Sequence, residues 1–77
     1  MKLNRIKIKG YYGTWYVVDS CIYPDPEFFP GKGKRYYCLE HESYGDETYN
    51  LLIDSDYNVL SDDSFGSAYD LCVDYFG

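Results

Sequence analysis

Three cysteines and one histidine are the residues best suited to chemistry in this 77-residue chain. Cys38 and His41 lie three positions apart in a segment with strand character, and an odd spacing places them on opposite faces of a strand. We therefore expect no thiol–imidazole pair there. A zinc site has little support, because the chain has no second histidine and no Cys-x-x-Cys motif. His41 lies between two glutamates and is expected at the surface, with its charged form favoured.

Acidic residues are the next candidates for chemistry. The segment 54–58 opens like a calcium loop, with side-chain oxygens at its first, third and fifth positions. Val59 stands where such a loop needs glycine, and Phe65 stands where it needs glutamate. An Asx-rich hairpin turn is therefore the expected structure. Adjacent carboxylates elsewhere are weak evidence for acid–base work in an acidic protein. We expect no catalysis, no metal and no cofactor.

Charge is divided unevenly along the chain. The net charge is −6, yet residues 1–35 carry seven basic and three acidic residues. Residues 36–77 carry ten carboxylates and no lysine or arginine. This division favours electrostatic steering of a partner. An alternative stays open, in which the acidic residues only keep a tyrosine-rich chain in solution.

Two binding surfaces follow from this division. In the first, the acidic half meets a basic protein surface, and its candidate residues are Glu40, Glu42, Asp46, Glu47, Asp62 and Asp63. In the alternative, the basic half holds single-stranded nucleic acid by charge and base stacking, and its candidates are Arg5, Lys7, Lys9, Tyr11 and Tyr12. The downstream carboxylates would repel a phosphate backbone unless they face away, so nucleic acid is the less favoured partner.

Strands are the elements that must position most of these residues. Alternating apolar residues and runs of β-formers predict five strands, over residues 3–9, 14–23, 35–42, 48–54 and 59–60. A bulge is expected at Asp19-Ser20. Residues 24–34 contain three prolines and two glycines, which predicts a loop. Phe28 and Phe29 within this loop either fold back onto the core, which is the more common outcome for large apolar rings, or are displayed at the surface, and the sequence leaves both alternatives open.

A helix is predicted over residues 67–76, where Ala68, Leu71, Cys72 and Tyr75 follow a helical period and Ser67 is a candidate N-cap. The expected fold is a single small domain, residues 1–77, of the α+β class and mainly β. It is an antiparallel meander sheet of four or five strands with one short C-terminal helix on one face. The expected core is Trp15, Val17, Leu39, Leu51, Ile53, Leu71 and Cys72.

Composition bears on the setting of the protein. No apolar run approaches the ~20 residues of a membrane span, and charged residues interrupt the N-terminal apolar ones. An odd number of cysteines with no close pair along the sequence predicts free thiols in a cytoplasmic setting. A short domain that is 21% aromatic also leaves room for a homodimer that buries exposed rings.

Several segments resemble one known family. They are residues 13–19, residues 36–47 with the block Leu-Glu-His-Glu-Ser-Tyr-Gly-Asp-Glu, residues 52–54 and residues 59–60. Over about residues 5–75 the chain resembles small domains associated with large polyvalent proteins of phages and conjugative elements. The resemblance implies a gene of a bacterial mobile element and assigns no activity to any residue. It also implies a possible role as an acidic inhibitor of a host defence nuclease, whose carboxylates stand in for nucleic-acid phosphates.

Overall fold

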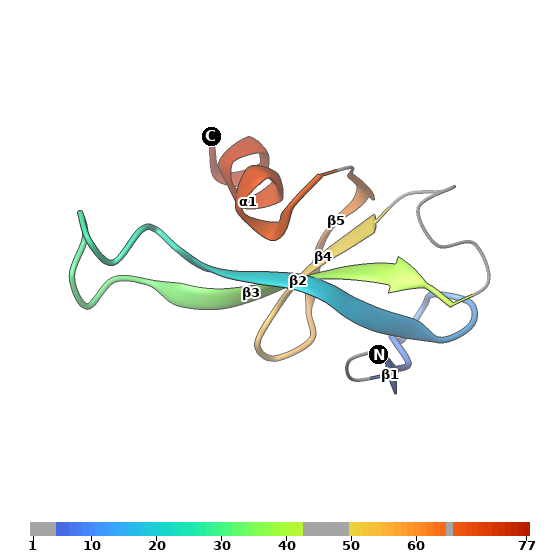
Figure 1. The fold of residues 1–77 in the computed structure, drawn as a ribbon. Coiled ribbons are helices and arrows are strands. Elements are labelled where there is room, and N and C mark those ends of the chain that lie inside the picture. The colour runs from blue at the N-terminus through green and yellow to red at the C-terminus, as the bar shows by residue number, and fades with distance from the viewer. Residues whose placement is uncertain (1–4, 43–49, 65) are drawn as a thin grey trace.

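The structure, a computed structural model, describes residues 5–42, 50–64 and 66–77. One antiparallel sheet contains five strands that pair in chain order, and one helix follows it (Figure 1). The elements are β1 (Arg5–Ile6), β2 (Trp15–Tyr23), β3 (Lys34–His41), β4 (Asn50–Asp54), β5 (Val59–Ser64) and α1 (Ala68–Phe76). The expected α+β meander is confirmed, with a shorter first strand and a longer fifth strand than predicted.

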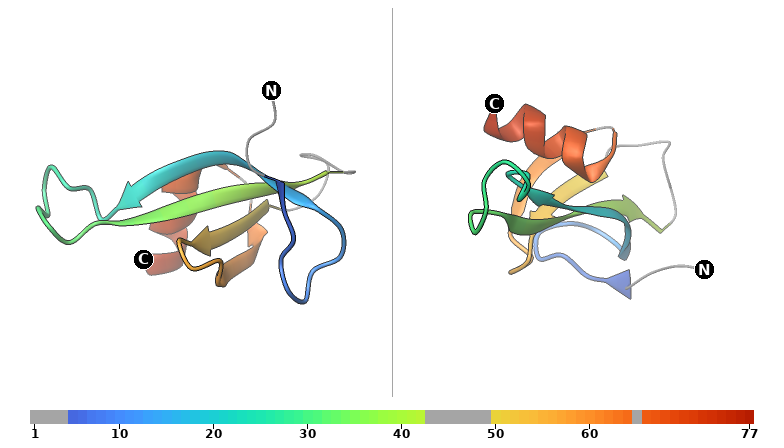
Figure 2. Two further views of the ribbon diagram at one scale, coloured as in Figure 1. Left: turned by 90° about the horizontal axis from the view of Figure 1, so that it is seen from below. Right: turned by 60° about the vertical axis from the view of Figure 1, so that its left-hand side comes forward.

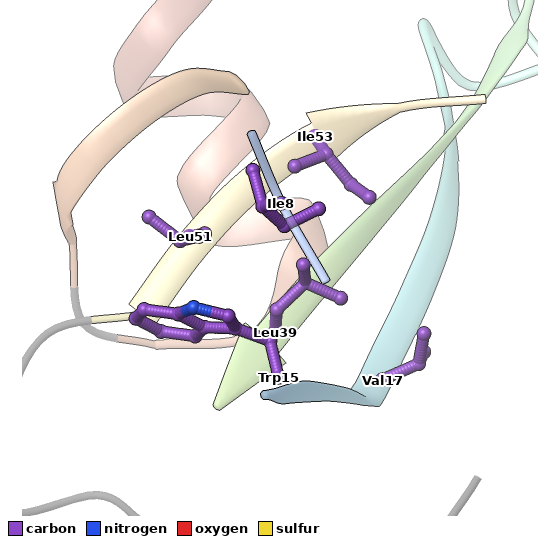
Figure 3. Packing of buried hydrophobic residues seen from close by; sticks show 6 residues of the cluster. All are labelled: Ile8, Trp15, Val17, Leu39, Leu51 and Ile53. Carbon is purple, nitrogen blue, oxygen red and sulfur yellow. The ribbon is translucent and has the colours of Figure 1, made fainter. Parts of the chain in front are cut away.

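Each face of the sheet is covered by a different part of the chain. The helix lies over one face, and the N-terminal segment between β1 and β2, which contributes Ile8 to the core, lies against the other (Figures 1 and 2). We call these the helix face and the N-terminal face. The core of the N-terminal face is Ile8, Trp15, Val17, Leu39, Leu51 and Ile53 (Figure 3). The core of the helix face is Tyr36, Cys38, Leu52, Ala68, Leu71 and Cys72. All seven residues expected in the core are buried.

A bulge in β2 allows this strand to serve both cores. Its pairing with β3 shifts between Val17 and Asp19, so Val18 is the extra residue. Before the bulge, Trp15 and Val17 pack in the core of the N-terminal face. After it, Cys21 packs against the core of the helix face, although its number has the same parity. The bulge lies next to the predicted Asp19-Ser20 position.

Helix α1 is held at its start by two side chains. Ser67 is the N-cap, and its hydroxyl accepts a hydrogen bond from the Asp70 N–H at 3.2 Å. The Asp19 carboxylate accepts another from the Ala68 N–H at 2.8 Å. Both acceptors satisfy donors that a helix leaves unpaired at its first turn. The predicted cap is confirmed, and the bulged strand β2 supplies a second one.

The connection between β2 and β3 extends past both covered faces (Figure 2). The backbone of this loop forms hydrogen bonds within the loop, because the Phe28 and Phe29 N–H groups both donate to the Asp25 carbonyl, at 3.1 and 2.9 Å. Of the two alternatives left open for these rings, display at the surface is the one observed, since Phe28 is 72% exposed and Phe29 is 54% exposed. The hairpin reaches beyond the core, so the rings have no apolar surface to cover.

Candidate interaction surface

His41 is a structural residue, and its expected surface position is wrong. It pairs across the sheet with Trp15 and is only 4% exposed. Its ring packs edge-on against the Trp15 ring, with centroids 5.0 Å apart, and Nε2 lies 3.0 Å from the Tyr12 carbonyl oxygen. Cys38 packs in the core of the helix face instead, so the predicted separation of this thiol from the imidazole is confirmed.

The turn at 54–58 is the Asx-rich turn that the sequence predicts. Asp54 Oδ1 accepts the backbone N–H groups of Asp56 and Asn58, both at 2.9 Å, and Oδ2 accepts the Asn58 side-chain amide at 3.2 Å. Burial tends to raise the pKa of Asp54, but these hydrogen bonds outweigh it and hold the pKa below its ordinary value. Within the described ranges, no three His, Cys, Asp or Glu side chains are grouped to hold a metal ion.

The predicted basic strand is partly neutralised within the chain. Arg5, a candidate for binding nucleic acid, forms an ion pair with Glu42, a candidate for binding a basic protein surface. Tyr11 packs against the core of the N-terminal face, and its hydroxyl donates to Asp62 Oδ2 at 2.8 Å. Its ring meets Trp15 edge-on. Arg5 and Tyr11, two of the five candidates for binding nucleic acid, therefore already contact carboxylates of the domain itself.

The other three nucleic-acid candidates remain at the surface. Lys7, Lys9 and Tyr12 are exposed. Tyr12 is 85% exposed and stacks on His41 with an interplanar angle of 12°, which leaves its other face open. These side chains lie on the segment between β1 and β2.

Two predicted acidic residues lie together on the helix face. Register places Arg5, Tyr16 and Glu40 in one cross-strand row, and paired residues point to the same side of a sheet. The Tyr16 hydroxyl contacts Glu40 Oε1 at 3.5 Å. Glu42 is joined to the end of this row by its ion pair with Arg5. We call these four residues, Arg5, Tyr16, Glu40 and Glu42, the β1–β3 patch.

Asp62 lies apart from the β1–β3 patch. It is on β5, and its bond to Tyr11 places it beside the core of the N-terminal face, whereas Glu40 points to the helix face. The predicted acidic residues are thus not all on one surface. Asp46 and Glu47 fall outside the described residues, as does the side chain of Asp63.

A recess outside the predicted residues lies between the β4–β5 turn and the end of the helix. It has a volume of about 230 Å³. Its lining mixes cations, carboxylates and aromatic rings, and includes Lys34, Arg35, Asp54, Asp56, Tyr75 and Phe76. Sequence reasoning missed it because residues from three distant segments meet there. The mixed charges select no single class of ligand.

Tyr16 is the patch residue that sequence reasoning missed. The one signal in the sequence was its residue type, since tyrosine is enriched at protein interfaces. It was lost among eleven tyrosines, several of which pack against the cores. Only the strand register separates Tyr16 from them.

The comparisons with known proteins agree with the predicted resemblance. In the described part of the chain, no helix combines the length and the apolar character needed to cross a membrane. No curated protein and no solved structure is similar enough to count as a match. One family model matches residues 1–67, which is most of the chain and ends just before α1. The chain therefore belongs to the family described as large polyvalent protein-associated domain 18.

Proposed function

We propose that this domain is a protein-interaction module whose acidic residues contact a basic protein surface. Membership of a family described as associated with large polyvalent proteins is in keeping with a binding role. The setting that we propose is a phage or another bacterial mobile element. A host defence nuclease is the partner that best fits an acidic surface there, because carboxylates can occupy a channel built for phosphates.

One observation favours the acidic surface over the nucleic-acid alternative. Arg5 is paired with Glu42, and Tyr11 is bonded to Asp62, so part of the basic strand is already balanced by carboxylates. Any phosphate brought to this strand would approach those same carboxylates, which repel it. Glu40, by contrast, has a tyrosine and not a cation as its cross-strand partner on β2, which supports it as a contact for a basic protein surface.

Charge reversal tests this proposal. The domain is immobilised, partners are captured from host cells and identified, and the capture is repeated with Glu40→Lys/Glu42→Lys. The matched control is Asp56→Lys/Asp70→Lys, which changes net charge equally at exposed positions outside the β1–β3 patch. We expect the first variant to lose the partner and the control to keep it, with binding that weakens as salt rises. If the two variants capture the partner equally well, the proposal that Glu40 and Glu42 contact it is rejected.

A direct titration addresses the alternative. Labelled single-stranded DNA is added to the unmodified domain at physiological salt, and to the variant Lys7→Gln/Lys9→Gln. We expect no saturable binding to either protein. Tight binding that is lost in the variant, with a smaller dependence on salt, would favour the nucleic-acid function instead.

A further inference from the structure

Two thiols that are far apart in the sequence are in contact in the folded domain. Cys21 of β2 and Cys72 of α1 are 51 positions apart, and their sulfur atoms lie 3.6 Å from each other. Both are free thiols. A disulfide bond needs a separation of about 2.05 Å, so the two sulfur atoms must move about 1.5 Å closer to bond.

The backbone around this pair is anchored on both sides. Before Cys21 in β2, the Asp19 carboxylate holds the first turn of α1 through the Ala68 N–H. After it, Tyr23 stacks on Phe76 at the last turn, with ring centroids 5.3 Å apart and an interplanar angle of 10°. The helix is thus fixed to β2 at both ends, and Cys72 lies between the two contacts. The proximity of the sulfur atoms is therefore a property of the packed domain.

The two thiols differ in their access to solvent. Cys72 is fully buried, whereas Cys21 is only partly buried. An oxidant can therefore reach Cys21 first, and Cys72 is placed to resolve the product. The third thiol, Cys38, is also buried, and its sulfur contacts the Gly66 carbonyl oxygen at 3.7 Å.

We propose that Cys21 and Cys72 form a reversible disulfide that ties α1 to β2. The oxidant is a low-molecular-weight disulfide such as oxidised glutathione. The Cys21 thiolate attacks one glutathione sulfur, the glutathione disulfide breaks, and one glutathione thiolate leaves. The Cys72 thiolate then attacks Cys21 Sγ and expels the second glutathione thiolate. The two protons from the cysteines end on the two glutathione molecules, which are the reduced products.

Protonation sets the speed of this reaction. Burial raises the pKa of Cys21, and burial together with the Cys21 contact raises the pKa of Cys72 to about 12. Because the thiolate is the nucleophile, both steps are slow near neutral pH and accelerate as the pH rises. The disulfide closes a long loop, which lowers the unfolding equilibrium constant by at most roughly 10³-fold in the chain-entropy model.

Mass spectrometry of the folded domain tests the proposal. No lysine or arginine follows Arg35, so trypsin leaves Cys21 in peptide 10–32 and both other cysteines in peptide 36–77. The domain is incubated with oxidised glutathione, free thiols are alkylated, and the peptides are mapped. In Cys38→Ala, a link between the two peptides reports the proposed bond alone. In the unmodified chain, further cleavage at aspartates separates residue 38 from residue 72, which covers the case that Cys38→Ala does not fold.

We expect an intramolecular link between Cys21 and Cys72 that reductant removes, together with a higher midpoint of chemical unfolding in the oxidised form. In Cys72→Ala, the reaction should stop with glutathione attached to Cys21. Stable glutathione on Cys21 of the unmodified domain, or a link from Cys21 to Cys38, would overturn the proposal. A link that forms equally in denaturant would also overturn it, because the folded contact would then have no part in the reaction.

Discussion

Gly13→Ala probes how closely the β1–β2 connection packs on His41. Gly13 has a φ of +84°, and a Cβ there would overlap His41 Nε2 and lie 2.9 Å from Cε1. Gly10 is a matched control, since its φ is +89° and no atom lies within 4 Å of the Cβ position. Both substitutions carry the backbone penalty of a left-handed alanine, about 1–2 kcal/mol. Both also receive the same entropic gain from the loss of a flexible glycine.

The difference between these two variants isolates the clash. The added methyl group displaces the imidazole and weakens its hydrogen bond with the Tyr12 carbonyl, so overpacking should add about 1–3 kcal/mol. We therefore expect Gly10→Ala to lower the free energy of unfolding by about 1 kcal/mol and Gly13→Ala by about 2–4 kcal/mol.

Urea unfolding followed by circular dichroism measures both values, provided that the denaturant slopes agree with that of the unmodified domain. A double-mutant cycle sharpens the result, because Gly13→Ala should be no worse than Gly10→Ala once His41 is replaced by alanine. Equal losses for the two glycine variants in the unmodified background would refute the packing of His41 against Gly13.

Three other predictions follow from the contacts described. Asp19→Ala removes the acceptor for the Ala68 N–H and should destabilise the domain by about 0.5–2 kcal/mol, measured by thermal or urea unfolding; an unchanged midpoint would contradict this cap. The pKa of Asp54 is lowered on folding, so the stability that this carboxylate contributes is present above its unfolded pKa, near 3.8, and is lost as the pH falls through the folded pKa. The NMR resonance of the Asn58 amide should follow that titration, because this amide donates to Asp54. A titration midpoint at the ordinary pKa would contradict the prediction. The homodimer stays a prediction, supported by the exposed rings, and light scattering that gives a monomer mass at high concentration would exclude it.

The order and type of the elements were predictable from local pattern. Alternation, β-branched residues and turn residues act over a few positions, so they are readable without a structure. The five strands, the meander order, the Asx turn at 54–58 and the Ser67 cap are all of this kind. The resemblance to the polyvalent protein-associated family was also carried by short blocks of sequence.

The failures concern residues whose environment depends on distant segments. The glutamates beside His41 in the sequence suggested an exposed position. In the sheet, however, His41 is the cross-strand partner of the buried Trp15, and both side chains are buried on the same face. For Phe28 and Phe29 the sequence left burial and display both open, and the hairpin carries them past the surfaces that could cover them. Apolar character alone does not say whether a covering surface lies within reach.

The candidate surfaces also have one property that could be predicted from the sequence and others that could not. The charge asymmetry was readable from the sequence, because charge is a property of each residue. It could not determine that Arg5 is paired with Glu42, that Asp62 lies away from Glu40, or that Cys21 touches Cys72. Those contacts depend on strand register, and the bulge at Val18 changes which residues of β2 face the helix. A one-residue shift in a strand exchanges its two faces, so these contacts could be assigned only once the register of the folded sheet was known.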